Sequence, residues 1–450
     1  MNKKDFHNIR NQFNRMINSF DQSQISTQKI ISICFDAQNN LSDFLNQFSL
    51  EDYPIFLSNN EFSAYSFGKE YSFSFYSEYD YKSNKDEMIK LVSDTLFINS
   101  KNHYKTFIFG GLNFDLSESN NKIWNDMPVG HFTLPRYTFT DSKLIINLFL
   151  DNKVSFNEIN QLFSQYIDNL ERIFIKNQVN NMKSELLDIS DLESHDLYHR
   201  KINNFLETFK RSNSDLIKVV FSRIKKASFS YKVPLINIYK KLLSKNSRNM
   251  NFLYSIKDDA SVIGSTPELI LSKLNHEIQS ESIAGSNYSN KTNHFTSDKK
   301  EVIEQKIVTD YIIEFFKKNT ADIKYNDKPK IKKLSNIEHL CTSFSARLKN
   351  DKNILDLLID LHPTPAIGGY PKEKAIDMIR SLKENRGWYG GPLGWIDNNL
   401  DGQFYLNIRS GLGVNKDLYL FSGSGITEKS NSDNEWDETE YKFKSMLESL

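Results

Sequence analysis

The sequence predicts an α+β fold. Short segments rich in Ile, Phe and Tyr and bounded by Asn, Asp, Ser or Gly are typical of β-strands. Between them lie segments whose apolar residues recur at helical spacing. Strands and helices do not alternate regularly, which disfavours a doubly wound parallel sheet. With 450 residues, 39% hydrophobic and 13% aromatic, the chain can bury a large core in one large domain or in two to three smaller ones.

The first half is predicted to contain five strands and one long helix. The helix spans about Phe156–Lys183, where apolar residues recur at helical spacing. The polar, acidic stretch Leu187–His199 that follows is the expected linker between the two halves of the chain. The strands are expected at Ile30–Phe35, Tyr53–Leu57, Ala64–Phe75, Lys105–Asn113 and Leu144–Leu150.

The second half is predicted to mix strands and helices in the same irregular way. Helices are expected at about Tyr198–Lys210, Ser297–Lys318, Ile354–Leu361, Lys372–Asn385 and Asn434–Leu447. Strands are expected at Ile217–Ser222, Phe252–Ile256, Ser261–Ser265, Gly391–Ile396, Gln403–Arg409 and Leu418–Ser422.

Charge and composition exclude several classes of protein. Lys and Arg together number 57, as do Asp and Glu, so no net charge favours nucleic acid or an anionic membrane. An anionic substrate would therefore need a local site. There is no 18-residue apolar run and no apolar segment after the N-terminus. The two cysteines, Cys34 and Cys341, fit a reducing compartment, so we expect a cytoplasmic protein.

Two residues are candidates for proton transfer. Lys218 lies in a β-branched run, and burial there would lower the pKa of its amine towards that of a general base. The alternative is a lysine on the exposed face of an edge strand. Glu268 follows Pro267 and precedes a Leu-Ile-Leu strand, which fixes its carboxylate at a turn-to-strand junction. It could equally be an ordinary turn acid.

Three glutamates are candidates for a metal site. Glu304 lies beside the apolar stripe of a predicted helix. Glu435, Glu438 and Lys442 share one face of the last predicted helix. They form either an ordinary solvated ion pair or a carboxylate site for Mg²⁺ with a lysine for a substrate anion. No His/Cys cluster suggests zinc.

Glycine-containing segments and one arginine are candidates for anion binding. Glycine allows backbone N–H groups to approach an anion closely, although tight turns would use it as well. Arg409 could bind a carboxylate in a bidentate manner or pair with a buried acid. The segments match neither a phosphate-binding loop nor a dinucleotide fingerprint. They are Ala284-Gly285-Ser286, Gly387–Trp395 and Ser422-Gly423-Ser424-Gly425.

The order of these motifs resembles the chorismate-utilising enzymes, which include isochorismate, salicylate, anthranilate and aminodeoxychorismate synthases. The resemblance covers roughly residues 195–450, with fainter matches at Phe109–Asp115 and Leu134–Arg136. The matching motifs begin at Lys218-Val-Val-Phe-Ser-Arg, Ser265-Thr-Pro-Glu-Leu, Ser282-Ile-Ala-Gly-Ser, Glu338-His-Leu, Leu361-His-Pro-Thr-Pro, Arg386-Gly-Trp-Tyr-Gly-Gly, Ile408-Arg-Ser, Ser422-Gly-Ser-Gly-Ile and Glu435-Trp-Asp-Glu.

The resemblance implies an α/β sandwich of two stacked, mainly antiparallel sheets flanked by helices. Residues 1–190 would form its N-terminal half and residues 195–450 the chorismate-binding region, in one structural domain. Ala284 stands where aminodeoxychorismate synthases carry a nucleophilic lysine, and Lys218 where anthranilate synthases carry glutamine. The Leu361–Pro365 run is characteristic of isochorismate synthases. The resemblance therefore favours an isochorismate synthase over a salicylate synthase, without a glutaminase subunit.

The resemblance also implies roles for residues. Lys218 would deprotonate the water that attacks C2 of chorismate, and Glu268 would protonate the departing C4 hydroxyl. Mg²⁺ would be held by Glu304 and Glu438, with Glu435 acting through water; Glu301 is a rival for Glu304. The product would serve menaquinone or siderophore biosynthesis. Substrate-binding residues would be Ala284, Gly285, Ser286, His339, Arg409, Gly423, Ser424, Gly425 and Lys442.

Overall fold

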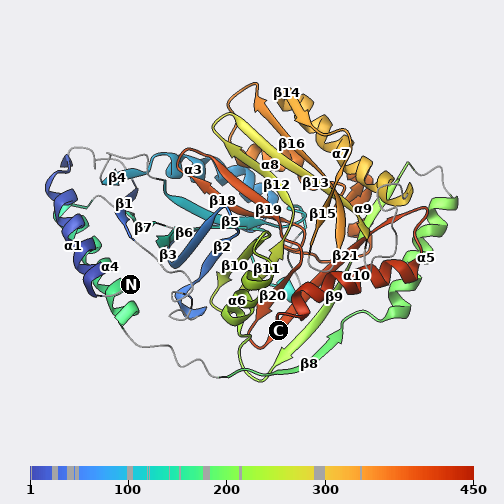
Figure 1. Ribbon diagram of the computed structural model, residues 1–450, viewed down its shortest axis with the longest axis horizontal. Coiled ribbons are helices and arrows are strands. Elements are labelled where there is room, and N and C mark those ends of the chain that lie inside the picture. Colours follow the sequence, from blue (N-terminus) through green and yellow to red (C-terminus); the bar gives the residue numbers. More distant parts are fainter. Residues whose placement is uncertain are drawn as a thin grey trace.

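The structure is a computed structural model of mixed antiparallel sheets and helices, and it confirms the predicted α+β fold (Figure 1). No helix among the described residues is long and apolar enough to cross a membrane. The described residues are 1–450 without 2, 23–28, 38–44, 46–49, 99–104, 119, 121, 141, 152–153, 176–182, 212–214, 288–298 and 335–336.

The elements of the N-terminal half begin with a helix and alternate irregularly. They are α1 (Lys3–Asn18), β1 (Ile30–Asp36), the short 3₁₀ helix η2 (Leu50–Asp52), β2 (Ile55–Ser58), β3 (Ser63–Phe75), α3 (Glu78–Ser93), β4 (Leu96–Ile98), β5 (Phe107–Leu112), η3 (Lys122–Trp124), β6 (Gly130–Phe139), β7 (Lys143–Phe149), α4 (Phe156–Ile175) and β8 (Leu186–Asp191).

The elements of the C-terminal half end in the helix α10. They are α5 (His195–Arg211), β9 (Lys218–Phe229), α6 (Leu235–Lys245), β10 (Met250–Lys257), β11 (Ala260–Thr266), β12 (Leu269–Leu274), β13 (Glu277–Asn287), α7 (Lys299–Asn319), β14 (Thr320–Tyr325), β15 (Lys330–Lys333), β16 (Glu338–Leu348), α8 (Ile354–Leu361), β17 (Gly369–Tyr370), α9 (Lys372–Ser381), β18 (Pro392–Asp397), β19 (Gly402–Leu406), β20 (Ser410–Val414), β21 (Asp417–Thr427) and α10 (Ser432–Leu447).

The strands form two sheets that share the long strand β6. The first sheet has the order β8-β9-β21-β20-β11-β10-β2-β3-β6-β7-β1-β4. The second runs β6-β5-β18-β19-β12-β13-β16, and both β14 and β15 pair with β16. Among the described strands, only the β1–β4 pairing is parallel. Strands from the two halves of the chain are interleaved, since β2 pairs with β10 and β5 with β18.

The molecule has four layers, in the order helix, sheet, sheet and helix. The apolar side chains form three cores, one between each pair of neighbouring layers. Successive residues of a strand point to opposite faces. In β2, Ile55 and Leu57 therefore join one core, while Phe56 joins another. The core containing Ile55 unites residues of β5, β10, β18 and β19, so it lies between the sheets. The other two lie under α1, α4 and α6, and under α3, α7, α8 and α9.

Two chain segments cross from one sheet to the other beside each other. One joins β11 to β12 through Glu268, and the other joins β19 to β20 through Arg409. Their backbones are hydrogen-bonded, with Leu406 N donating to Glu268 O at 3.1 Å and Ser265 N donating to Arg409 O at 3.1 Å. Glu268 and Arg409 are therefore fixed side by side at the junction of the sheets.

The predicted linker at Leu187–His199 is wrong. This segment contains β8, which pairs with β9 at the edge of the first sheet, and the start of α5. All six residues of β8 are exposed. An exposed edge strand has a polar sequence like that of a linker, which explains the error. The predicted strand at Ile217–Ser222 is also too short, because β9 continues to Phe229.

Candidate active site

The predicted site residues come together in one pocket at the junction of the sheets. Strands β9, β13, β16 and β21, helices α7 and α10 and both crossing segments contribute to its walls. Twelve of the residues predicted from the sequence line it: Lys218, Glu268, Ala284, Gly285, Ser286, Glu304, His339, Arg409, Gly423, Gly425, Glu438 and Lys442.

Two predicted residues, Ser424 and Glu435, do not line the pocket. The Ser424 hydroxyl lies 2.8 Å from the Tyr198 hydroxyl on α5, because alternate residues of β21 face opposite sides. Its side chain therefore does not face the pocket, so the predicted binding of substrate by this segment would use its backbone. Glu435 is fully buried behind Glu438 and accepts a hydrogen bond from Lys300 Nζ at 2.8 Å.

Lys218, the first residue of β9, is buried with 2% of its surface exposed. Its Nζ lies 4.0 Å from Glu304 Oε2. Gly425 makes room for this pair: a Cβ at residue 425 would lie 2.6 Å from Lys218 Cε and 3.1 Å from Glu304 Oε1. The Ser422-Gly-Ser-Gly segment thus clears space for the lysine as well as exposing backbone to the pocket.

Glu268 is the acid of the pocket. Burial raises the pKa of its carboxyl to about 8, against a weaker lowering by Lys332. Among the residues that the structure describes, no cationic side chain forms an ion pair with it within 4.0 Å. A carboxyl in this environment carries its proton at neutral pH, so it can act as a general acid.

Arg409 is held by a neutral histidine. His339 is buried, and burial together with Arg409 lowers the pKa of its imidazole to about 3. Its Nδ1 therefore donates to Gly285 O at 2.9 Å, and its Nε2 accepts from Arg409 Nη2 at 3.1 Å. Arg409 also adopts a positive φ of 51°, which is uncommon outside glycine. The guanidinium is thus pre-positioned for an anion in the pocket.

Lys442 provides a second cation at the pocket wall. Its Nζ donates to Gly423 O at 2.8 Å and lies 2.6 Å from Glu438 Oε1. Ser286 donates a further hydrogen bond to Glu438 Oε1 at 3.0 Å. Although burial raises the pKa of Glu438, Lys442 and Lys300 outweigh it and bring the value to about 2. Glu438 is therefore a carboxylate at all physiological pH values.

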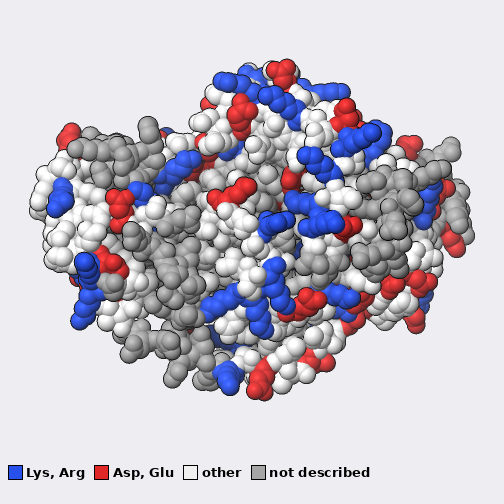
Figure 2. Space-filling view, viewed as in Figure 1, with Lys and Arg blue, Asp and Glu red and all other residues white. Residues whose placement is uncertain are grey.

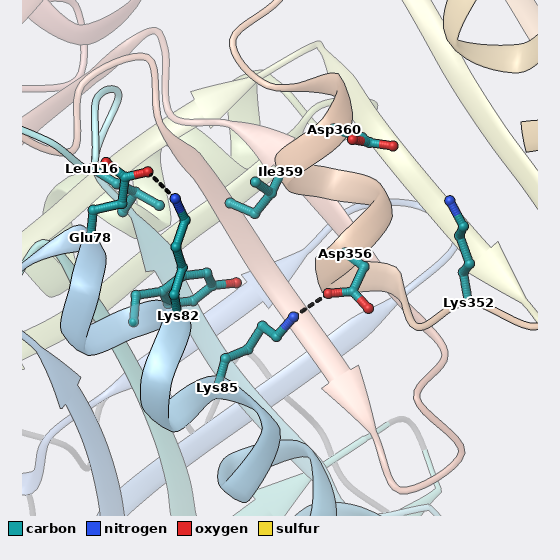
Figure 3. Close-up of a pocket in the computed structure, with 9 residues that line it drawn as sticks. Glu78, Lys82, Lys85, Leu116, Lys352, Asp356, Ile359 and Asp360 are labelled. Atoms are coloured by element: carbon teal, nitrogen blue, oxygen red, sulfur yellow. Dashed lines mark hydrogen bonds and ion pairs between the residues drawn. The ribbon is translucent and has the colours of Figure 1, made fainter. Parts of the chain in front are cut away.

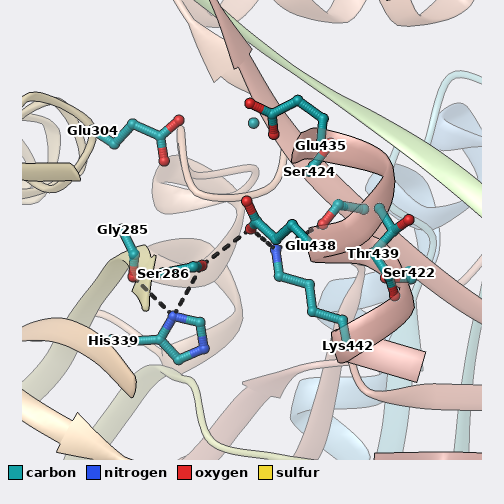
Figure 4. A network of polar contacts seen from close by, with 12 residues as sticks. Gly285, Ser286, Glu304, His339, Ser422, Ser424, Glu435, Glu438, Thr439 and Lys442 are labelled. Carbon is teal, nitrogen blue, oxygen red and sulfur yellow. Dashed lines mark hydrogen bonds and ion pairs between the residues drawn. The ribbon is translucent and has the colours of Figure 1, made fainter. Parts of the chain in front are cut away.

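Four glutamates from α7 and α10 crowd together beside the pocket. Burial is the main cause that raises the pKa values of Glu301 and Glu435 to about 7; neighbouring carboxylates add to it, and Lys300 opposes it. Among the described residues, Glu304 Oε1 and Glu435 Oε2 are buried without a hydrogen-bond partner. Figure 4 shows the carboxylates of Glu304, Glu435 and Glu438 directed at a common space. Lys300 and Lys442 pair with Glu435 and Glu438, and the buried carboxylate oxygens that remain unpartnered fit a divalent cation.

Lys300 supplies the cluster's internal counter-charge, and sequence reasoning missed it. Burial lowers the pKa of its amine, but the surrounding carboxylates, with Glu435 the strongest, raise it well above the usual range. Glu301 differs from Glu304 in its hydrogen bonding, because Glu301 Oε2 accepts a hydrogen bond from the Ser286 backbone N–H at 2.6 Å. A pair of lysines at the start of a helix resembles an ordinary solvated turn, so no local pattern indicates this role.

The Leu361–Pro365 run precedes two residues of the pocket wall and is held in place by hydrogen bonds. Its His362 Nε2 bonds to Phe114 O at 3.0 Å, and Lys372 Nζ donates to His362 O at 2.6 Å. These contacts fix the following residues Ala366 and Ile367, which form part of the pocket wall. The run therefore shapes the site without providing a charged group to it.

A second pocket lies between α3 and α8 and differs in its electrostatics (Figure 3). Two of its three lysines are paired with carboxylates: Lys82 bonds to Glu78 at 2.5 Å and Lys85 to Asp356. The face of the molecule in Figure 2 likewise mixes positive and negative side chains. A small anion is therefore better accommodated beside Arg409 in the first pocket, because this guanidinium contacts the neutral His339 and, among the described residues, forms no ion pair within 4.0 Å.

Comparison with known proteins agrees with this geometry. The isochorismate synthase MenF of Bacillus subtilis is 28% identical over 353 residues, covering 76% of this chain and 74% of that protein. The salicylate biosynthesis isochorismate synthase of Pseudomonas aeruginosa is 44% identical over 125 residues, covering 28% and 26%. The solved MenF, the menaquinone-specific isochorismate synthase from Escherichia coli, has the same fold, with a TM-score of 0.78, 19% identity and 99% coverage of both chains.

The family model described as "Chorismate binding enzyme" matches residues 12–450. The match includes the weakly patterned N-terminal half and all the residues that line the pocket. The resemblance inferred from the motifs is thereby confirmed, and the chain belongs to the chorismate binding enzyme family.

Proposed function

We propose that the protein is an isochorismate synthase that adds water to C2 of chorismate and expels the C4 hydroxyl. The observation that carries this proposal is that one pocket contains a buried amine, which could accept a proton, and a buried carboxyl, which could donate one. Lys218 is an amine and Glu268 is a carboxyl whose pKa lies near 8. The names of the relatives, which include isochorismate synthases from bacteria and from Arabidopsis thaliana, support the same activity.

The reaction requires one proton to be removed and one to be delivered. Lys218 takes a proton from the attacking water, whose oxygen bonds to C2 of the ring. The ring double bond shifts, and the C4–O bond breaks. Glu268 gives its proton to that oxygen, which leaves as water. One water enters and one leaves, so the reaction is an isomerisation.

The substrate is an anion with two carboxylates, and the pocket offers matching groups. Arg409 and Lys442 line the pocket and would bind the enolpyruvyl carboxylate, together with the backbone near Gly423. His339 orients Arg409 without adding charge, because its imidazole is neutral. These fixed groups supply positioning, which contributes much of the rate in such reactions.

The carboxylate cluster is the proposed site of Mg²⁺. Glu304 and Glu438 line the pocket and would hold the ion, with Glu435 acting through water. Glu301 is less suited, because the backbone of Ser286 already engages its carboxylate. When bound, the ion would neutralise the second carboxylate of the substrate. Mg²⁺ commonly takes one or two protein carboxylates and completes its shell with water and substrate oxygens.

The test is product analysis with purified full-length protein. Chorismate and Mg²⁺ are incubated without an ammonia source, and the products are separated by chromatography. Isochorismate is the expected product, and reaction in ¹⁸O-labelled water should place one heavy oxygen at C2. Glu277→Gln, an exposed change on β13, serves as the matched control for pocket variants.

Other outcomes would reassign the activity. Pyruvate released in step with chorismate loss would make the protein a salicylate synthase. Turnover that appears only when an ammonium salt is added would favour an amination. Unlabelled isochorismate in ¹⁸O-labelled water would exclude attack by solvent water. Folded protein that leaves chorismate unchanged would overturn the proposal.

A further inference from the structure

A group of three potential metal ligands lies on α5 and α10 outside the pocket. His195 and His199 are one turn apart on α5, so they share a face of that helix. Asp433 lies in the first turn of α10, which packs alongside α5 (Figure 1). Among the described residues, this is the group of His, Cys, Asp or Glu residues whose ligand atoms all lie within 4.8 Å of one another.

The spacing of the three ligand atoms suits a tetrahedral ion. Zinc binds nitrogen and oxygen ligands at about 2.0–2.1 Å, which places tetrahedral ligand atoms about 3.3 Å apart. His199 Nε2 lies 3.1 Å from Asp433 Oδ1, and His195 Nε2 lies 4.0 Å from the same oxygen. The first separation is close to the tetrahedral value, and the second is larger.

The orientation of His199 also points to an ion. Its Nδ1 lies 3.2 Å from the Ser432 hydroxyl, and when Nδ1 donates to that oxygen, Nε2 presents a lone pair towards Asp433. That Nε2 is buried, and no hydrogen bond to it is present among the described residues. His199 Nε2 and Asp433 Oδ1 lie 3.1 Å apart, close enough for one ion to contact both atoms. Metal-bound histidines are commonly held in this way through the second ring nitrogen.

The neighbouring rings hold the site in place. The rings of His195 and His199 lie with their centroids 4.1 Å apart, and Trp436 packs against His195 at 4.7 Å. Trp436 also lies over the guanidinium of Arg223, within a buried cluster. The imidazoles are therefore supported by packing, although His195 and Asp433 themselves are exposed and accessible to an ion.

We propose that His195, His199 and Asp433 bind one first-row transition-metal ion, with zinc(II) as the best fit. Two imidazoles and one carboxylate suit zinc, nickel or copper rather than magnesium, which prefers oxygen ligands. The ion would join α5 to the N-terminal turn of α10. Because α10 also carries Glu438 and Lys442, the metal would stabilise the helix that supports one wall of the pocket. The proposal does not depend on the proposed function.

The test uses the full chain without an affinity tag, stripped with EDTA and dialysed. Zinc chloride is titrated by calorimetry in the presence of saturating Mg²⁺ and without chorismate. One zinc ion per chain is expected to bind, and zinc is expected to raise the melting temperature. Cobalt(II) in the same protein should give the visible absorption of a four-coordinate site.

Variants assign the ligands. His199→Ala and Asp433→Asn should lose the bound zinc and the cobalt spectrum, while their melting temperatures in EDTA stay at that of the parent protein. His276→Ala, an exposed histidine on the β12–β13 turn, is the matched control and should bind zinc as the parent does. Zinc binding unchanged in His199→Ala, or absent from the parent protein, would refute the site.

Discussion

The most direct prediction concerns the proton carried by Glu268. Burial raises the pKa of its carboxyl from 4.5 to about 8. At pH 7 about nine in ten molecules therefore carry the proton, whereas an ordinary glutamate would carry it in about one molecule in 300. A general acid works only in its protonated form. We expect kcat/KM to fall above pH 8, tenfold for each further pH unit.

The Glu268→Gln variant has no acidic proton, so both its turnover and its stability against unfolding should differ from those of the parent. Its turnover should fall about 10²- to 10⁴-fold, the usual contribution of a general acid, and the decline above pH 8 should disappear. Its stability should change in the opposite direction. A folded-state pKa raised above the unfolded value stabilises the native state at low pH, and this contribution is lost as the pH rises through about 8.

The difference between 4.5 and about 8 corresponds to about 5 kcal/mol, an upper bound on what ionisation of Glu268 costs the fold at pH 9. Glu268→Gln cannot ionise, so it should unfold at higher denaturant concentration than the parent at pH 9. At pH 4 this advantage should be absent. Chorismate consumption from pH 6 to 10 and urea unfolding at pH 4 and 9 measure the two effects, with Glu277→Gln as control. Activity within tenfold of the parent, or an unchanged decline above pH 8, would refute the acid role.

Four further predictions test the rest of the site. Lys218→Ala should abolish turnover with an unchanged melting temperature; retained activity would remove the proposed base. Gly425→Ala should also nearly abolish turnover, because its Cβ would lie 2.6 Å from Lys218 Cε. A crystal structure of this variant would show the displaced lysine. EDTA should stop the reaction and Mg²⁺ restore it, while Glu438→Gln should require much higher Mg²⁺; activity after full chelation would exclude the metal. Lys300→Met removes a buried counter-charge, so it should destabilise the metal-free protein by about 3–5 kcal/mol and make its melting temperature rise with Mg²⁺ more than the parent's does.

The parts of the site that could be predicted from the sequence are those with a local pattern. Lys218 in a β-branched run, Glu268 after a proline and the face shared by Glu438 and Lys442 were all visible in short windows, and they meet in one pocket. Their convergence depends on the crossings between the two sheets, for which the sequence has no local signal. The motifs supplied that information only through the resemblance to a family.

The features that escaped prediction depend on contacts between distant segments. Lys300 becomes a counter-ion only because α10 places Glu435 beside it. The exposed strand β8 has the polar composition of a linker, and only its pairing with β9 distinguishes the two. His195 and His199 stand at a spacing common in any helix, and the third ligand comes from a different helix. In each case a residue's environment, and not its type, determines its role.

Glu268 and Glu438 show how strongly environment separates two identical side chains. Both are buried in the same pocket, and burial alone would raise both pKa values. Glu438 lies 2.6 Å from Lys442 and accepts a hydrogen bond from Ser286, so its pKa falls to about 2 and it remains a carboxylate. Glu268 lies on the crossing segment without a cation at contact distance among the described residues, so its pKa rises to about 8. One pocket thus keeps one glutamate charged and another protonated, and two carboxyl groups whose pKa values are driven apart are the pattern expected of a site that transfers protons at neutral pH.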